Sequence, residues 1–190
     1  MASYGTSDFK KGLKVQLDGE PYLIVDLDFM KPGKGQAVYR IKVKNMVTGR
    51  VLDKSYRSGD SIDSADVEEK SMQFLYKDGQ NYHFMDGESF EQFELTPEQV
   101  GDSGQWLVEE MQCEVVFYNG SPITCSPPNH VDLQVTYTEP GAKGNSTGNV
   151  QKPATLSTGA ELMVPVFINL DDIVRIDTRT GAYVERVTKS

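Results

Sequence analysis

Short apolar runs separated by turn-forming residues fill the first third of the chain. The run LKVQL is followed by Asp18-Gly19 and then by YLIVDLDF, and an Asp-Gly step between such runs favours a β-hairpin. The next segment, AVYRIKVKN, alternates between apolar and polar positions, which is the period of a half-buried strand. The pattern predicts five short strands in about sixty residues, as in a small barrel of the SH3-like or KOW-like type.

The same hairpin rhythm continues through the rest of the chain. SMQFLY and NYHFMD flank the turn at 77–80, and CEVVFY and ITCS flank Asn119-Gly120. The last third contains VDLQVTY, LMVPVFI, IVRID and AYVERV, with a turn at 178–181. Two further β-rich units of about sixty residues each predict barrels of the OB-fold type. We therefore expect an all-β chain of three domains over residues 1–65, 66–128 and 129–190.

One short helix is expected inside the second domain. Thr96 followed by Pro97 is typical of a helix N-cap with proline at the first helical position. Residues 105–111 are expected to add a helical turn.

Composition favours a protein that works outside membranes. Hydrophobic residues make up 38% of the chain and charged residues 25%, and no run approaches the eighteen or so apolar residues of a membrane span. The N-terminal MASYGTSDFKKG lacks the apolar core of a signal peptide, so a cytoplasmic location is expected. The two cysteines, Cys113 and Cys125, lack metal-ligand spacing and are predicted to be reduced, half-buried thiols.

The net charge of -9 argues at first against nucleic acid, because binding to phosphates requires a basic surface. The three expected domains differ, however. They hold 11, 2 and 6 Lys+Arg against 8, 13 and 7 Asp+Glu, which gives net charges of +3, -11 and -1 and recovers the total. The basic first domain is therefore the part expected to meet RNA, and the acidic second domain the part expected to avoid it.

No set of catalytic or metal-binding residues can be assembled from the sequence. Neither His83 nor His130 stands at zinc-ligand spacing. The segments 33–35 and 141–148 lack the Gly-Lys-Ser/Thr ending of a phosphate-binding loop. We therefore expect no catalytic residue, metal or cofactor, and an enzyme acting on RNA is disfavoured.

The segment Lys31-Pro32-Gly33-Lys34-Gly35 lies between two predicted strands. Pro32 fixes one backbone angle and the two glycines permit positive φ, so Lys34 is predicted at the apex of a tight hairpin. Such a position suits a functional amine, although exposed loop lysines usually have no special role. The sequence of this segment alone leaves both interpretations open.

Three basic residues follow on one face of the next strand. Arg40, Lys42 and Lys44 are two residues apart, and the period of a strand places them on the same side. They could follow an RNA backbone, or they could simply be a solvated strand face. The basic balance of this domain favours RNA.

The chain resembles the bacterial elongation factor P family over nearly its whole length. DFKKGLKVQLDGEPYLIVDLDFMKPGKGQA is similar to its first domain and FLYKDGQNYHFMDGESFEQFEL to its second. SPPNHVDLQV and KPATLSTGAELMVPVFINLDDIVRIDTRTGAYVERV are similar to its third domain, including the closing signature Asp-Thr-Arg-x-Gly-x-Tyr-x-x-Arg. The resemblance implies three β-barrels in an L-shaped, tRNA-like arrangement.

The resemblance also implies a function. A family member is a monomeric, non-catalytic translation factor that binds both ribosomal subunits beside the peptidyl-tRNA and relieves stalling at consecutive prolines. Lys34 matches the lysine that a modifying enzyme extends with β-lysine or an aminopentanol group. Tyr183 and Arg186 match a C-terminal pair near the small subunit and the tRNA, and residues 144–149 match a loop that reaches the exit-site codon.

Two other functions remain open on the sequence. The chain could be an elongation-factor-P-like paralogue, which typically lacks the lysine-tipped loop, or a generic RNA-binding module without polyproline specificity. Cosedimentation with ribosomes separates these binding functions from an RNA-directed enzyme, which would instead turn over its substrate.

Overall fold

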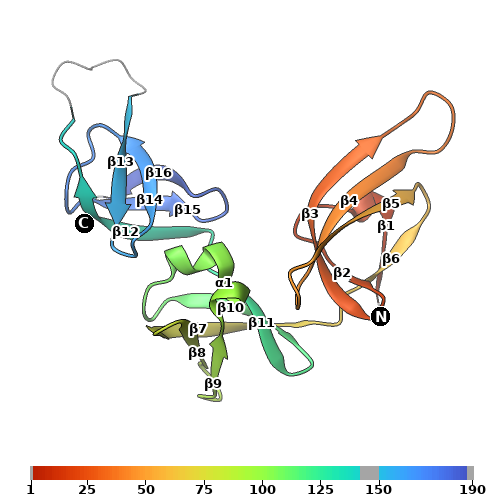
Figure 1. Cartoon of the computed structure of the whole chain (residues 1–190), viewed down its shortest axis with the longest axis horizontal. Coiled ribbons are helices and arrows are strands. Elements are labelled where there is room, and N and C mark those ends of the chain that lie inside the picture. The colour runs from red at the N-terminus through yellow and green to blue at the C-terminus, as the bar shows by residue number, and fades with distance from the viewer. Residues whose placement is uncertain (1, 142–149, 188–190) are drawn as a thin grey trace. The chain divides into compact units, whose positions relative to one another are not determined.

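The computed structural model describes residues 2–141 and 150–187. Apart from short helical segments its regular structure is β, arranged in three antiparallel sheets (Figure 1). The chain divides into two compact units, one formed by residues up to Glu69 together with Val116–Thr124, the other by Lys70–Val115 with the chain from Cys125 onward. The three sheets confirm an all-β chain with three β-domains. The domain limits at residues 65 and 128 and the L-shaped arrangement stay predictions.

The first sheet has six strands in the order β1-β6-β2-β3-β4-β5. They are β1 (Ser3–Gly5), β2 (Lys14–Leu17), β3 (Glu20–Met30), β4 (Val38–Asn45), β5 (Val51–Arg57) and β6 (Ser61–Ser64), with a 3-10 turn at Thr6–Asp8. The predicted number was five. The extra strand, β1, spans three residues and pairs with β6, and so short a segment has no hydrophobic periodicity to detect.

The core of this sheet follows from the alternation in the sequence. Val15, Ile24, Ile41 and Val43 are at most 1% exposed, while the residues between them on β4 face solvent. Asp18 and Gly19 both have positive φ, 51° and 79°, as a type I′ turn requires. The predicted Asp-Gly hairpin is therefore confirmed, and it fixes the register of β2 on β3.

The second sheet has the order β11-β10-β7-β8-β9. Its strands are β7 (Glu68–Asp78), β8 (Asn81–Asp86), β9 (Gln92–Leu95), β10 (Gln112–Tyr118) and β11 (Ser121–Ser126). Both predicted hairpins are confirmed, and Asn119 and Gly120 again adopt positive φ in the turn between β10 and β11. The end of this hairpin belongs to the first unit, where the Tyr118 hydroxyl donates a hydrogen bond to the carbonyl oxygen of Gly19 at 3.1 Å.

The helical segment of this domain begins as predicted but ends earlier. The backbone N–H of Gln99 donates to Thr96 Oγ1 at 3.3 Å, and Gln99 Oε1 accepts from the Thr96 N–H at 2.9 Å, which is a capping box. Helix α1 covers Pro97–Val100 and a 3-10 helix continues over Gly101–Trp106. The helical turn expected at 105–111 is confirmed only for Gln105 and Trp106, the end of the 3-10 helix, because Leu107 is already extended.

The third sheet has the order β14-β13-β12-β15-β16. Its strands are β12 (His130–Thr138), β13 (Gln151–Leu156), β14 (Glu161–Pro165), β15 (Ile173–Asp177) and β16 (Ala182–Val187). Trp106, from the 3-10 helix, is 4% exposed and belongs to the core of this third sheet. The indole thus joins the second and third predicted domains within the second compact unit.

Both cysteines are free, as predicted, but more deeply placed than half-buried. Cys113 and Cys125 are each 3% exposed. Burial raises the pKa of each thiol to about 12. Both sulfurs are therefore neutral, unreactive thiols at ordinary pH.

Candidate functional site

The loop that carries Lys34 closes the hairpin of β3 and β4 (Figure 1). Met30 pairs with Val38 at its base, and the Ala37 carbonyl oxygen accepts a hydrogen bond from the Ser58 N–H at 2.9 Å. Residues 31–36 are all exposed. Lys34 lies in the middle of this segment, which we call the tip loop, and contributes nothing to the core.

The tip loop is wider than the tight turn that the sequence predicted. The tip loop together with Ala37 makes seven residues, 31–37, between the end of β3 and the start of β4. The chain therefore need not reverse within two residues. Gly35 has φ +114°, whereas Gly33 is outside the positive-φ region. Only Gly35 therefore uses the conformational freedom of glycine. Pro32 has no backbone N–H to donate, which suits a loop outside the ladder.

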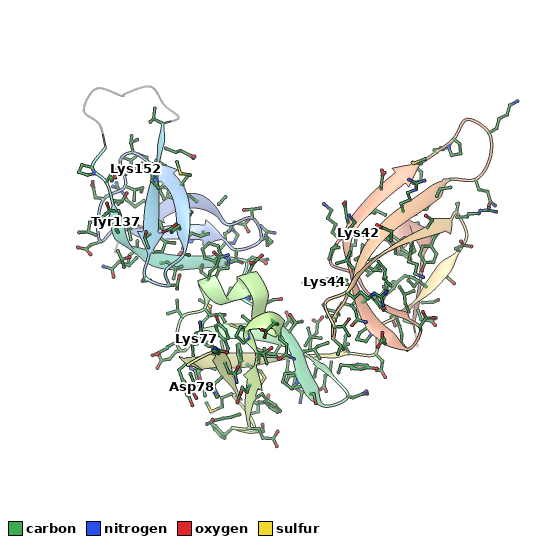
Figure 2. All side chains as sticks on the ribbon, viewed as in Figure 1. Lys42, Lys44, Lys77, Asp78, Tyr137 and Lys152 are labelled. Atoms are coloured by element: carbon green, nitrogen blue, oxygen red, sulfur yellow. The ribbon has the colours of Figure 1, made fainter. Side chains whose placement is uncertain are left out.

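Arg40, Lys42 and Lys44 are exposed along β4, opposite the buried Ile41 and Val43. The three basic side chains therefore lie on one face of β4, as the alternation of the sequence predicted. Figure 2 shows Lys42 and Lys44 on this ribbon. The three cations and the tip loop thus belong to one continuous hairpin.

Carboxylates on the two neighbouring strands partly neutralise this basic face, which the sequence pattern did not reveal. Arg40 lies opposite Asp28 on β3, and Lys42 lies between Asp26 on β3 and Asp53 on β5. Directly opposed residues in antiparallel strands project to the same side. The signal was present in the alternation of β3, but only the register shows which charges become neighbours.

Tyr183 and Arg186 lie on β16, which belongs to the second compact unit, whereas the tip loop belongs to the first. Three residues apart, they would point to opposite faces of a regular strand. The ladder with β15 shifts register, however, so that Tyr183 pairs with Ile176 and Arg186 with Val174. Since Ile176 and Val174 share a face, the bulge places Tyr183 and Arg186 on that face too.

The surroundings of Arg186 combine charge and an aromatic ring. Its guanidinium carbon lies 5.4 Å from the centroid of the Phe167 ring, and Nη1 lies 3.8 Å from Asp172 Oδ2. Burial raises the pKa of Tyr183, and the charge of Arg186 opposes this shift. Tyr183 therefore presents a neutral hydroxyl beside a cation. Sequence reasoning missed Phe167, because nothing in the chain order links it to Arg186.

Other predicted features have simple outcomes. The loop at 144–149 lies outside the described residues. Within residues 2–141 and 150–187, no group of three or more His, Cys, Asp or Glu could hold a metal ion. No helix in that part of the chain is long and apolar enough to cross a membrane.

Comparison with known families and structures covers almost the whole chain. Three family models match: the elongation factor P KOW-like domain at residues 5–62, the elongation factor P OB domain at 67–125, and the elongation factor P C-terminal domain at 131–186. An elongation factor P from Rhodopirellula baltica is 52% identical over 187 residues, which are 98% of this chain and 96% of that protein.

A solved structure resembles part of the fold. Eukaryotic translation initiation factor 5A from Methanococcus jannaschii matches 66% of this chain and 92% of its own with a TM-score of 0.52 and 21% identity. At that identity the match bears on the fold alone. Three consecutive family domains and a full-length relative are decisive together: the chain belongs to the elongation factor P family of translation factors.

Proposed function

We propose that this protein binds the ribosome beside the peptidyl-tRNA and promotes peptide bond formation between consecutive prolines. Lys34, extended by a covalent adduct, would reach the acceptor end of the peptidyl-tRNA. The observation that carries the proposal is an exposed lysine in the middle of the tip loop, on a chain that belongs to the elongation factor P family throughout its length.

The geometry of the hairpin supports this role for Lys34. Ile41 is the first fully buried residue of β4 after the loop, and it lies seven positions after Lys34 in the chain. At about 3.3 Å per residue this allows a reach of roughly 20 Å beyond the core. A narrow ribbon of this length can enter an RNA cavity that a whole barrel cannot.

Positioning is the expected mechanism. The proline ring fixes one backbone angle and removes the amide hydrogen, which makes proline a poor partner in peptide transfer. A factor that holds the peptidyl-tRNA end in a reactive arrangement raises the rate tenfold for each ~1.4 kcal/mol of barrier removed. No acid, base or metal from the factor is required, so the ribosome remains the catalyst and the factor is not an enzyme.

The adduct and its enzyme are part of the proposal. Residues 31–36 are all exposed, which would give a modifying enzyme access to the Lys34 amine. Either a β-lysine or an aminopentanol group would lengthen the side chain and keep an amine at its end. A terminal amine could then donate charge-assisted hydrogen bonds to the tRNA backbone.

The remaining partners would be contacted by other parts of the molecule. The Arg40 to Lys44 face would lie against RNA near the peptidyl-tRNA, and Tyr183 with Arg186 would lie near the small subunit. The exit-site codon would be reached by residues 144–149. We expect the factor to act as a monomer in the cytoplasm.

The test is in vitro synthesis of two proteins that differ only in a run of three prolines. Adduct-bearing wild type should raise the yield of the proline-run protein and leave the control message unchanged, and Lys34→Ala should abolish the gain. Lys54→Ala is the matched control, because Lys54 is an exposed lysine of the same domain. Equal yields with wild type and Lys34→Ala would refute the proposal. A gain on both messages would favour a generic RNA-binding module.

A further inference from the structure

Phe90 lies at the turn between β8 and β9 (Figure 1) in a conformation that aromatic residues rarely adopt. Its φ is +61°, in the left-handed region that favours glycine and asparagine. Its side chain is 69% exposed, more than any other exposed large hydrophobic side chain in residues 2–141 and 150–187. A large apolar residue therefore occupies a position whose backbone conformation favours glycine or asparagine and whose exposure to solvent favours a polar side chain.

Hydrogen bonds hold this turn in place. The Phe90 N–H donates to the Asp86 carbonyl oxygen at 2.9 Å, and the Asp86 N–H donates to the Glu91 carbonyl oxygen at 2.9 Å. Asp86 Oδ1 accepts from the Glu88 N–H at 2.8 Å. The hydrogen bonds thus fix the backbone that carries the Phe90 ring. A fixed backbone lowers the conformational-entropy cost of binding a partner.

The charge around Phe90 is negative. Between residues 79 and 98 the chain has five carboxylates and no lysine or arginine, the carboxylates being Asp86, Glu88, Glu91, Glu94 and Glu98. Glu88 and Glu91, beside Phe90 in the turn, are exposed. Hydrogen bonds from the Glu88 and Ser89 amides lower the pKa of Asp86. The charge of Lys70 also lowers the pKa of Asp86, by less than these hydrogen bonds do.

We propose that Phe90 is a docking anchor that inserts into an apolar pocket on a basic ribosomal protein, with Glu88 and Glu91 facing cations at the rim of that pocket. This inference rests on the proposed ribosome binding. A large aromatic side chain that is exposed and held at positive φ breaks a local preference, and such residues cluster at functional sites. An exposed aromatic on a rigid support is also typical of residues that dominate an interface.

Charge decides between a protein and RNA as the partner. A base could stack on the ring, but the phosphates around it would be repelled by Glu88 and Glu91. A basic protein surface gains from the same carboxylates, and its lysines or arginines could also lie over the ring face. The ribosome offers both RNA and basic proteins, and only the second complements this turn.

Three variants separate docking from folding. Phe90→Gly should weaken binding to purified 70S ribosomes about tenfold without lowering the thermal midpoint, because glycine adopts this φ freely. Phe90→Tyr should keep the affinity within about twofold. Tyr137→Ala is the matched control, since Tyr137 on β12 is 62% exposed (Figure 2), and it should change the affinity by less than about twofold.

Glu88→Gln with Glu91→Gln distinguishes the class of partner. Against a basic protein the double variant should bind several-fold more weakly, whereas against RNA it should bind more tightly. A photo-crosslinking phenylalanine at position 90, irradiated with the same ribosomes, should attach to a ribosomal protein. Tighter binding of the double variant, a crosslink to ribosomal RNA or one to a second copy of this chain would overturn the proposal.

Binding of the wild type to 70S ribosomes distinguishes failure of the proposed function from failure of the docking anchor. If wild type fails to bind 70S ribosomes, the proposed function fails and this inference fails with it. If wild type binds and Phe90→Gly binds equally well, only the docking anchor is refuted.

Discussion

Lys34 and Lys42 are exposed lysines of the same hairpin, but their surroundings differ. Lys42 lies between Asp26 and Asp53 in the register of the sheet, whereas residues 31–36 contain no carboxylate. The amine of Lys34 is therefore not neutralised by a neighbour in the loop. An uncompensated charge on an exposed stem suits both a modifying enzyme and a cavity of RNA phosphates.

The first prediction concerns the covalent state of Lys34. Protein purified from its native host should carry an adduct on this side chain, because the exposed tip loop gives a modifying enzyme free access. Peptide mass spectrometry across Lys34 should find an added mass equal to a β-lysine or an aminopentanol group, and the peptide containing Lys54 serves as the internal control. An unmodified mass at Lys34 would contradict the prediction.

The second prediction concerns the two buried thiols. Burial raises the pKa of both Cys113 and Cys125 from 9.0 to about 12, so almost no thiolate forms in the folded protein at pH 8. A thiolate-selective reagent should leave both unlabelled at pH 8 and should label both after denaturation. Rapid labelling of native protein would show that the thiols are accessible.

The same thiol pKa values imply a pH dependence of stability. In the unfolded chain the thiols lose their protons near pH 9, whereas in the folded state they keep them until about pH 12. The unfolded state then binds fewer protons, so the free energy of unfolding falls as pH rises between 9 and 12. Cys113→Ala with Cys125→Ala should remove this part of the loss.

At the scale of elements, bulges and register decide which predicted residues meet. The family resemblance identified Tyr183 and Arg186 as a pair, but a regular strand would separate them. The bulge in the ladder of β15 and β16 brings them to one face. Glycine-poor bulges leave no clear pattern in a sequence, so this juxtaposition could not be predicted from the residues alone.

The third prediction concerns the β4 face. Replacing Arg40, Lys42 and Lys44 together by glutamine should weaken ribosome binding and flatten its salt dependence. Three free phosphate contacts would lower the slope by about three units, but Asp26, Asp28 and Asp53 already offset part of the charge. We therefore expect a decrease of about one to two units, measured by cosedimentation over a series of salt concentrations.

The control for this face removes a negative charge instead of positive charges. Asp53→Asn, which frees Lys42 from one neighbouring carboxylate, should strengthen ribosome binding and steepen the salt slope. An unchanged slope in both variants would show that the β4 face points away from RNA.

At the scale of the whole molecule, hydrophobic alternation predicted the all-β class and the main hairpins, because turn residues and strand periodicity are local properties. Trp106 was not predicted as a core residue of the third sheet, since it follows the capped helix of the second domain. The end of the β10–β11 hairpin in the first unit was missed for the same reason. Contacts between distant segments depend on tertiary packing, which local patterns do not encode.

The fourth prediction tests this packing. Trp106→Ala should destabilise the second compact unit by about 3–5 kcal/mol, because a buried indole leaves a cavity in the core. Trp106→Phe should cost less. Urea unfolding followed by circular dichroism should show an earlier transition for the second unit, while the transition of the first unit is unchanged. A single unaltered transition would show that the indole does not link the two domains.

The proposed role of Lys34 can be tested by the single-turnover rate of proline–proline bond formation on stalled ribosomes. Adduct-bearing wild type, unmodified wild type and Lys34→Ala should be compared at saturating concentrations, with the ribosome dissociation constant measured for each. Contacts made mainly in the reactive arrangement raise the rate more than the affinity. We predict that the saturated rate falls at least about tenfold from the first protein to the last, while the dissociation constants agree within about threefold. Equal saturated rates, with or without a change in affinity, would show that Lys34 and its adduct do not promote proline–proline bond formation.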